Sequence, residues 1–480
     1  MAMKTGEQYI QSLKELKPPV YFMGEKIENL VDHPAIRPHI NAAAETYDLA
    51  YDPQFAELVS ARSHLTGERI NRFTHIHQSA EDLVTKVKML RALSQRTGSC
   101  YQRCVGFDAM NAVYATSYEI DQKHGTEYHG RFLEFLKHVQ ANDLMSCGAM
   151  TDTKGDRGLS PGQQPDPDQY LHIVERRKNG IVVRGAKTHQ TGAVNSHEII
   201  AMPTTALGPG EEDYAISFAV PADTPGLVYI FGRQTNDSRK IESAMDAGNP
   251  RYGAVGGEAL VVFDNVFVPR ERVFMCGEYE FAYPLVEKFA ALHRQNYGGC
   301  KGGVADVIIG AAATLAEYQG VSRAAHVRDK LTEMVHLAET LYCCSIACSS
   351  EGSPTPSGSW GVDTTLANIS KHNVTRFIYE IARLAQDLAG GFMATMPSER
   401  DLRHPEVGEY VQKYLQAAAG APAEHRMRMG RLIESLTTGI ALVESMHGAG
   451  SPQAQRVMIL RQADLESKKK LALRLARIDA

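Results

Sequence analysis

The chain has 480 residues, 43% of them hydrophobic and 22% charged, with a single tryptophan. This length exceeds what one hydrophobic core supports, so we expect two or three subdomains. A net charge of −5 excludes the basic field that nucleic-acid binding requires. The first residues carry charges throughout and lack the apolar core of a signal peptide, and no later stretch has the roughly 18 uninterrupted apolar residues of a membrane span. The sequence therefore predicts a cytoplasmic protein with no nucleic-acid or membrane partner.

The hydrophobic pattern divides the chain into three blocks. In residues 1–143, apolar side chains recur every three or four positions, as in EDLVTKVKMLRALSQR and YHGRFLEFLKHVQAND, which predicts helices. In residues 144–276, β-branched alternating runs such as GIVVRGAKTH and EALVVFDNVFVP stand between turns, which predicts an antiparallel barrel or sandwich. In residues 277–480 long helical runs return, among them VIIGAAATLAEYQG, NVTRFIYEIARLAQDLAGG and RMGRLIESLTTGIALVESM.

Eight cysteines are too few for a disulfide-stapled scaffold, so we expect reduced thiols. Five of them lie among small or apolar residues and are interpreted as packing residues: Cys147, Cys276, Cys343, Cys344 and Cys348. The other three, Cys100, Cys104 and Cys300, have polar, glycine-rich neighbours.

These three thiols and one histidine form a candidate metal site. His293 and Cys300, in ALHRQNYGGCKGG, are seven residues apart and project from one side of a helix. Cys100 and Cys104, in SCYQRC, share a face if that segment is helical. Three thiolates and an imidazole suit structural zinc or an iron–sulfur cluster, and spacing alone favours zinc. The alternative is a chance set of core cysteines with a satisfied histidine.

The order of the blocks resembles the acyl-CoA dehydrogenase architecture, in which two helical blocks pack together and a β domain covers a flavin between them. The run ALVVFDNVFVPRERVF is similar to the end of that family's β domain. The resemblance implies an α+β fold with a helical domain at 1–143, a central antiparallel β-barrel domain at 144–276 and a helical bundle at 277–480.

More specific motifs resemble the 4-hydroxybutyryl-CoA dehydratase family, over nearly the whole chain. They are GEKIENLVDHP, SCYQRCVGFDAMNAVY, GAMTDTKGDRGL, VVRGAKTHQTG, HRQNYGGCKGG, IYEIARLAQDLAGG and ESMHGAGSPQAQR. This resemblance reverses the preference for zinc and implies FAD together with a [4Fe-4S] cluster, one iron of which is held by His293. It also implies radical dehydration of 4-hydroxybutyryl-CoA to crotonyl-CoA, isomerisation of vinylacetyl-CoA to crotonyl-CoA, and a homo-oligomer built as a dimer of dimers.

The resemblance further implies a catalytic set. His293 is the first candidate base as well as a ligand. Glu258 follows two glycines at the start of a strand, where a carboxylate in a dry pocket has a raised pKa and exchanges protons near neutrality. Glu444 matches a second carboxylate of the family's site. Tyr297 and Lys301 flank the proposed ligands and are candidates for hydrogen bonds to substrate oxygen.

For the flavin, the informative stretches are GAMTDTKGDRG and GAKTHQTG, where small residues and hydroxyls admit the flavin ring. Their candidate FAD-binding residues are Met150, Thr151, Asp152, Arg157, Thr188, Gln190 and Thr191. Arg157 is a candidate for a phosphate or the coenzyme A moiety. Gln386 and Gly390 resemble positions that reach the FAD of a neighbouring subunit.

Two other functions remain open from the residues alone. One is a flavin-dependent aromatic monooxygenase or an acyl-CoA dehydrogenase relative with incidental cysteines. The other is a helical binding protein stapled by zinc.

Overall fold

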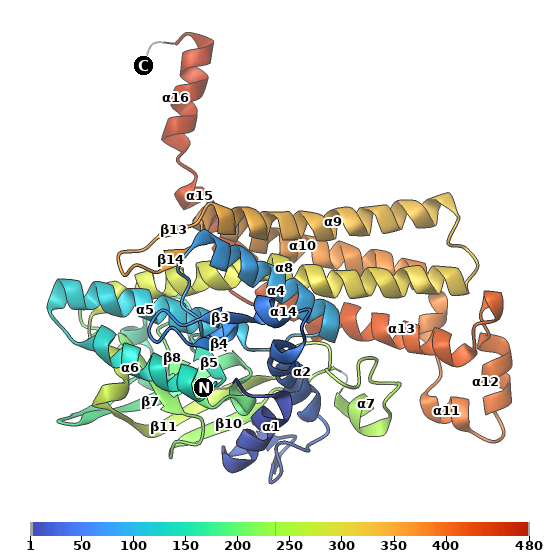
Figure 1. Ribbon diagram of the computed structural model, residues 1–480, viewed down its shortest axis with the longest axis horizontal. Coiled ribbons are helices and arrows are strands. Elements are labelled where there is room, and N and C mark those ends of the chain that lie inside the picture. Colours follow the sequence, from blue (N-terminus) through green and yellow to red (C-terminus); the bar gives the residue numbers. More distant parts are fainter. Residues whose placement is uncertain (1–2, 236, 479–480) are drawn as a thin grey trace.

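The computed structural model describes residues 3–235 and 237–478, in which a layer of long helices lies over a β region (Figure 1). The first block is helical, as predicted, and each long amphipathic run forms one helix. Its helices are α1 (Gly6–Glu15), α2 (Arg37–Asp48), α3 (Ala56–Val59), α4 (Ala80–Thr97), α5 (Cys104–His124) and α6 (Tyr128–Ala141). It also contributes the strands β1 (Val20–Phe22), β2 (Glu25–Lys26), β3 (Ser60–Arg62) and β4 (Arg69–Asn71).

The central block holds the predicted strands. They are β5 (Ser146–Ala149), β6 (His172–Arg177), β7 (Gly180–Thr191), β8 (Glu198–Ala201), β9 (Ile216–Pro221), β10 (Leu227–Phe231), β11 (Glu258–Pro269) and β12 (Val273–Cys276), with the helix α7 (Asp237–Glu242) before β11. A six-stranded sheet has the order β2-β1-β10-β11-β7-β6, and a four-stranded sheet has the order β12-β9-β8-β5.

The predicted closed, antiparallel barrel is wrong. The two sheets stay separate, and two strand pairs, β1 with β10 and β5 with β8, are parallel. The sheets meet through apolar side chains such as Phe218 and Phe263, whose ring centroids are 6.0 Å apart. Helices α5 and α6 pack on the four-stranded sheet. This sheet therefore lies between these helices and the six-stranded sheet, and the two sheets do not join into a barrel.

The third block is helical, as predicted. It comprises α8 (Ala282–Tyr318), α9 (Ala325–Ser350), α10 (Thr364–Ala389), α11 (Glu399–Arg403), α12 (Gly408–Leu415), α13 (Ala423–Thr437), α14 (Ile440–His447), α15 (Pro452–Gln462) and α16 (Leu465–Ala476), with a small hairpin of β13 (Ser353–Pro354) and β14 (Trp360–Gly361). The run RMGRLIESLTTGIALVESM forms two helices instead of one, because the chain leaves helical geometry at Thr438 and Gly439.

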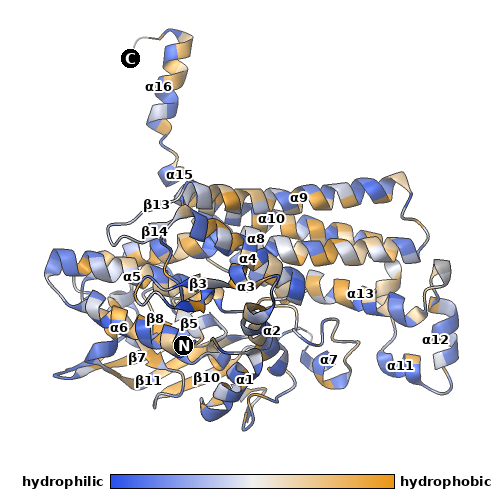
Figure 2. Cartoon of the chain, viewed as in Figure 1, coloured by the Kyte–Doolittle hydropathy of each residue, from blue (hydrophilic) through white to orange (hydrophobic). Residues whose placement is uncertain are grey.

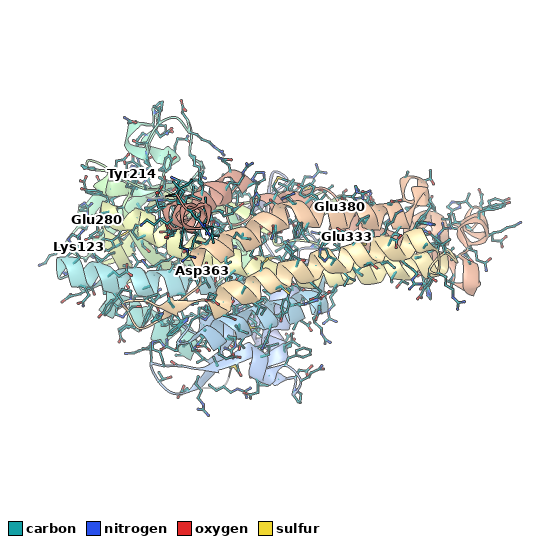
Figure 3. All side chains as sticks on the ribbon, turned by 90° about the horizontal axis from the view of Figure 1, so that it is seen from above. Lys123, Tyr214, Glu280, Glu333, Asp363 and Glu380 are labelled. Carbon is teal, nitrogen blue, oxygen red and sulfur yellow. The ribbon has the colours of Figure 1, made fainter. Side chains whose placement is uncertain are left out.

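Helix α8 is the centre of the bundle. It packs on α4, α5, α9, α10 and α13, and from above the long helices run side by side, with Glu333 on α9 and Glu380 on α10 at their surface (Figure 3). Over Tyr279–Tyr318 the chain is long and apolar enough to cross a membrane, but 56% of its most apolar window is buried inside the protein. Its apolar character is therefore accounted for by packing within the bundle.

The last helix stands apart from this body. Helix α16 projects away from the bundle beyond α15 (Figure 1), and hydrophilic and hydrophobic residues alternate along it (Figure 2). Its Leu471 and Leu475 side chains are 53% and 78% exposed.

Candidate functional site

The turn between α4 and α5 carries the first cysteine. Helix α4 ends at Thr97 with Gly98 as its C-cap, and α5 begins at Cys104. Between them Gln102 has a φ of 67°, so the chain reverses direction and SCYQRC is not one helical turn. The conditional prediction of a shared helical face therefore fails, and Cys100 approaches the site from a loop.

The three candidate ligand thiols share one enclosed region. Burial raises the pKa of the Cys100, Cys104 and Cys300 thiols, that of Cys300 to about 12. Cys300 also raises the pKa of the other two thiols, and Glu444 raises the pKa of both Cys100 and Cys300. A neutral thiol is the favoured form in such surroundings, and a bound cation inverts that preference.

The start of β11 lies against this region. A Cβ atom added to Gly256 would lie 2.7 Å from Cγ2 of Thr191 and 3.3 Å from Sγ of Cys100. Only glycine permits this approach, which brings the β region next to the turn that carries Cys100.

His293 is held through its Nδ1 atom. Oδ2 of Asp108 lies 2.8 Å from Nδ1 and also accepts a hydrogen bond from Nδ2 of Asn296 at 2.6 Å. Oδ1 of Asp108 accepts from Nζ of Lys86 at 2.5 Å, and both side chains of that ion pair are fully buried. Burial acts to raise the pKa of Asp108, but Lys86 and His293 outweigh it and hold the pKa below its usual value.

A second polar cluster surrounds Glu444. The Tyr297 hydroxyl donates to Oε1 of Glu444 at 3.0 Å, and Lys301 forms an ion pair with Oε2. Nζ of Lys371 lies 4.5 Å from the centroid of the Tyr297 ring and donates to the carbonyl of Ser445 at 2.7 Å. Burial acts to raise the pKa of Glu444, but Lys301, Lys371 and Tyr297 together lower it. Burial lowers the pKa of Lys371 to about 7.

Glu258 forms the third part of the site. The register of β7 and β11 places it opposite Thr191, whose hydroxyl lies 2.9 Å and 2.8 Å from the two carboxylate oxygens. Burial raises the pKa of Glu258 to about 8, and the Thr191 hydroxyl only partly offsets this. The carboxyl is therefore poised to exchange protons near neutral pH.

The predicted flavin residues form a seam between the loop after β5 and strand β7. The carbonyl of Thr151 accepts from the backbone N–H of Thr188 at 2.8 Å and from Nε2 of Gln190 at 3.2 Å. The carbonyl of Met150 accepts from Nζ of Lys187 at 2.8 Å, and Asp152 is paired with the same ammonium group at 2.8 Å. The Asp152 carboxylate is thus engaged within the protein.

Polar groups on this seam remain open to a ligand. No hydrogen bond or ion pair within the described ranges engages the Arg157 guanidinium or the Thr188 hydroxyl, and Arg157 is exposed. Gln386 lies elsewhere, where its Nε2 donates to the carbonyl of Thr437 at 2.9 Å, and Gly390 is the C-cap of α10. Lys371 and Gln386 are fifteen positions apart on α10, which is about 22 Å of helical rise.

Across residues 3–235 and 237–478, no group of three or more His, Cys, Asp or Glu side chains lies close enough to hold one metal ion. Ligands of a single zinc ion all lie within about 2.0–2.3 Å of it, so the Cys100, Cys104, His293 and Cys300 set does not form a zinc site of that kind. Ligands of a cluster bind different iron atoms, and a wider spacing suits them.

The sequence interpretation missed Lys86, Asp108 and Lys371. Each is a charged residue on the apolar face of an amphipathic helix, and a buried charge requires a partner. Lys371, for example, precedes the buried residues Val374 and Ile378 at intervals of three and seven. A charged residue at this spacing from apolar residues was the feature of the sequence that could have identified it.

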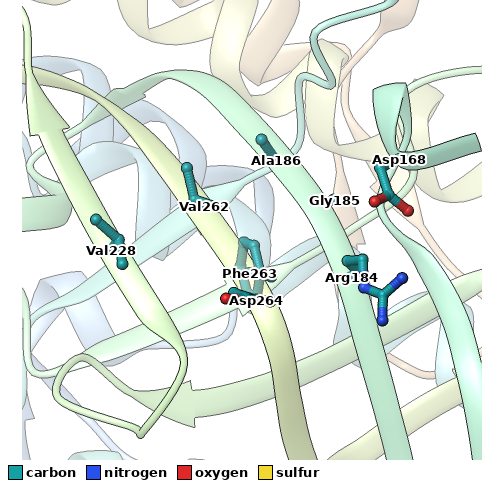
Figure 4. Close-up of a pocket in the computed structure, with 8 residues that line it drawn as sticks. All are labelled: Asp168, Arg184, Gly185, Ala186, Val228, Val262, Phe263 and Asp264. Carbon is teal, nitrogen blue, oxygen red and sulfur yellow. The ribbon is translucent and has the colours of Figure 1, made fainter. Parts of the chain in front are cut away.

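An open hollow of about 370 Å³ lies outside these clusters, on the six-stranded sheet (Figure 4). Its lining includes Ala186, Val228 and Val262. Side chains alternate along a strand, so Ala186 and Thr188 of β7 share a face, and the hollow adjoins the seam of predicted flavin residues instead of the cysteines.

Family models match almost all of the chain. The model described as 4-hydroxyphenylacetate 3-hydroxylase N terminal matches residues 5–275, and the corresponding C-terminal model matches residues 282–477. The 4-hydroxyphenylacetate 3-monooxygenase oxygenase component of Thermus thermophilus is 28% identical, over 90% of this chain and 88% of its own length. A crystal structure of such an oxygenase component complexed with FAD superposes with a TM-score of 0.85 at 25% identity, over 98% of both chains.

Two relatives are much more similar. The 4-hydroxybutyryl-CoA dehydratase/vinylacetyl-CoA-Delta-isomerase of Clostridium aminobutyricum is 57% identical, over 99% of this chain and 100% of its own length. The structure of an oxygen-tolerant archaeal 4-hydroxybutyryl-CoA dehydratase from N. maritimus superposes with a TM-score of 0.97 at 53% identity, over 100% of this chain and 96% of that one. The chain therefore belongs to the 4-hydroxyphenylacetate 3-hydroxylase family and, within it, to the 4-hydroxybutyryl-CoA dehydratases.

Proposed function

We propose that this protein is a lyase and isomerase that dehydrates 4-hydroxybutyryl-CoA to crotonyl-CoA and isomerises vinylacetyl-CoA to the same product. The observation that carries the proposal is 57% identity over the full length of a dehydratase/isomerase. The convergence of Glu258, three thiols and the Glu444 cluster supports it, because the reaction needs several proton-transfer and oxygen-binding groups around one substrate.

Two prosthetic groups belong to this proposal. Cys100, Cys104, Cys300 and Nε2 of His293 would hold a [4Fe-4S] cluster, and the donor set fits: three enclosed thiols, and an imidazole whose other nitrogen is already engaged by a carboxylate. FAD would lie along the seam of Met150–Asp152 and Thr188–Thr191, where the unengaged Thr188 hydroxyl and Arg157 guanidinium suit ring atoms and phosphate. When bound, FAD supplies one-electron exchange and the cluster supplies a Lewis-acidic iron for the leaving hydroxyl.

The dehydration removes one proton from C2, one proton from C3 and hydroxide from C4, and returns one proton to C4. Glu258, with its raised pKa of about 8, holds a proton at neutral pH and exchanges it with substrate carbon. His293, whose ring lies across Tyr297 with centroids 5.7 Å apart, is the second candidate for proton abstraction.

The ionised carboxylate of Glu444 has an orienting role in this proposal. It accepts from Tyr297 and Lys301 and so fixes where both donors lie. Lys371 anchors the same corner through the carbonyls of Ser445 and Met446. We assign Tyr297 and Lys301 to hydrogen bonds with substrate oxygen and Glu444 to holding them in place.

The wider organisation is proposed in the same terms. Domain boundaries near 143/144 and 276/277 are supported by the ends of α6 and β12, and the arrangement is acyl-CoA dehydrogenase-like. The separation of Gln386 and Gly390 from the Glu258 region supports a homo-oligomer, a dimer of dimers, in which they serve a neighbour's FAD. Free thiols at all eight cysteines support a reducing, cytoplasmic setting.

The test is an anaerobic purification followed by an absorption spectrum, iron and acid-labile sulfide analysis, and an assay of crotonyl-CoA formation from both thioesters. Flavin bands, iron with sulfide and both activities are expected. Flavin without iron would point to a monooxygenase-like protein. A colourless protein that contains only zinc would refute the proposal.

A further inference from the structure

We propose that Asp108, held by Lys86, is the positioning residue that presents His293 to iron with a bare Nε2 atom. The inference rests on the proposed [4Fe-4S] cluster and concerns residues outside its ligand set. It assigns a role to a buried charge pair on two helices of the first block, α4 and α5.

All three hydrogen-bond donors of the Lys86 ammonium group are engaged within the protein. Its ammonium group donates to Oδ1 of Asp108 at 2.5 Å, to the carbonyl of Leu292 at 3.1 Å and to Oε1 of Gln295 at 3.1 Å. An ammonium group has three donors, and all three are used. Because the side chain is fully buried, removal of any acceptor leaves a charge that water cannot reach.

The second oxygen of Asp108 determines the tautomer of the neutral His293 ring. A carboxylate only accepts hydrogen bonds, so the 2.8 Å contact requires the proton on Nδ1 of His293. The lone pair then lies on Nε2, which no hydrogen bond or ion pair within the described ranges engages. This is the arrangement in which a carboxylate behind a histidine fixes the tautomer that binds metal.

The same pair aligns the two halves of the ligand set. Asp108 lies one helical turn after Cys104 on α5. On α8, the two groups that accept from Lys86, Leu292 and Gln295, lie on either side of His293 in the sequence. His293 itself precedes Cys300 by seven residues on the same helix. The network therefore sets both the tautomer of His293 and the position of α8 relative to α5.

Replacing Asp108 by asparagine removes the negative charge and, in addition, should change the tautomer of His293. Asparagine offers one acceptor oxygen, and the buried ammonium of Lys86 claims it, because an unpaired buried charge costs more than a mismatched amide. The amide NH2 then faces Nδ1 of His293 and donates to it. That contact moves the histidine proton to Nε2, the tautomer that cannot bind iron.

The experiment compares iron and acid-labile sulfide per chain in anaerobically purified wild type, Asp108→Asn and Asp246→Asn. Asp246 is a matched control, because it forms a buried ion pair with Arg431 at 3.1 Å outside the proposed site. Asp108→Asn is expected to bind the histidine-held iron about 10- to 100-fold more weakly, and Asp246→Asn is expected to keep its iron. Equal iron loss in both variants would show a general effect of removing a buried pair and would overturn the inference.

Pulsed EPR of the reduced protein with 15N-labelled histidine reads the bond itself. The nitrogen coupling of His293 should disappear in any cluster that remains in Asp108→Asn. In Lys86→Met/Asp108→Asn the competing ammonium is gone, so the amide oxygen is free to accept from Nδ1 and the coupling should return. An unchanged coupling in the single variant, or no recovery in a folded double variant, would overturn the inference, and the single variant decides if the double does not fold. Wild type without any iron would instead refute the proposed function.

Discussion

Gly303→Ala tests the close packing of α8 on α4. A Cβ atom at Gly303 would lie 2.4 Å from the carbonyl oxygen of Arg91 and 2.7 Å from Cβ of Ser94. Neither atom is the end of a flexible side chain, so the two helices must separate. An ordinary van der Waals contact begins near 3.4 Å, so the required shift is about 1 Å, the difference between 3.4 and 2.4 Å.

The magnitude follows from two opposing effects. Overpacking of this kind costs about 1–3 kcal/mol, whereas alanine in a helix interior gains about 1 kcal/mol over glycine. Gly310→Ala, on the same helix, measures the second effect alone, because its Cβ would meet nothing within 4 Å, so the difference between the two variants isolates the overpacking. We expect Gly310→Ala to be slightly more stable than wild type, and Gly303→Ala to be less stable than Gly310→Ala by about 1–3 kcal/mol.

Function should respond more strongly than stability. Gly303 lies one turn after Cys300, and a displacement of about 1 Å at a reacting centre costs about 100-fold in rate. The assay is denaturant unfolding of both variants, with iron content and crotonyl-CoA formation measured on the same preparations. A Gly303→Ala protein as stable and as active as Gly310→Ala would refute this account of the packing.

The remaining predictions concern single side chains. Cys300→Ala should lose iron and dehydration together, whereas Cys348→Ala, in a buried site on α9, should keep both; full dehydratase activity in Cys300→Ala would remove it from the ligand set. Glu258→Gln should keep flavin and iron but turn over about 10²- to 10⁴-fold more slowly, and steady-state rates equal to wild type would exclude the proton-transfer role. For Lys371, the folded pKa of about 7 lies below the ordinary 10.5, so unfolding takes up a proton between these values and stability should rise with pH from about 7 to 10. Lys371→Met should flatten that rise in denaturant titrations, and an unchanged slope would contradict it.

The helices and strands were largely predictable, because periodicity reports which side of a segment is buried. The run EDLVTKVKMLRALSQR forms most of α4, and EALVVFDNVFVP forms the whole of β11. The arrangement of the strands in two separate sheets was not predictable, since alternation identifies a strand but not its neighbours. Residues 20–26, far from the central block, supply β1 and β2 to the six-stranded sheet.

The residues of the candidate site were more predictable from the sequence than the contacts between them. The seven-residue spacing identified His293 and Cys300, because the relative positions of their side chains are set by a single helix. Spacing failed for Cys100, because a positive φ at Gln102 turns the chain where four-residue spacing suggested a helix. The pairing of Glu258 with Thr191 depends on the register of β7 and β11, and the pairing of Lys86 with Asp108 on the packing of two helices, neither of which a linear pattern contains.

The order in which the chain is made has a consequence for iron loading. Cys100 and Cys104 leave the ribosome long before His293 and Cys300, and strands β5 to β12 lie between them in the chain. Contacts of such sequence separation form late, after the intervening chain has closed. A nascent chain therefore offers two thiols but no complete ligand set, and the proposed cluster would be acquired only by a chain whose β region and helix α8 have both reached their final places.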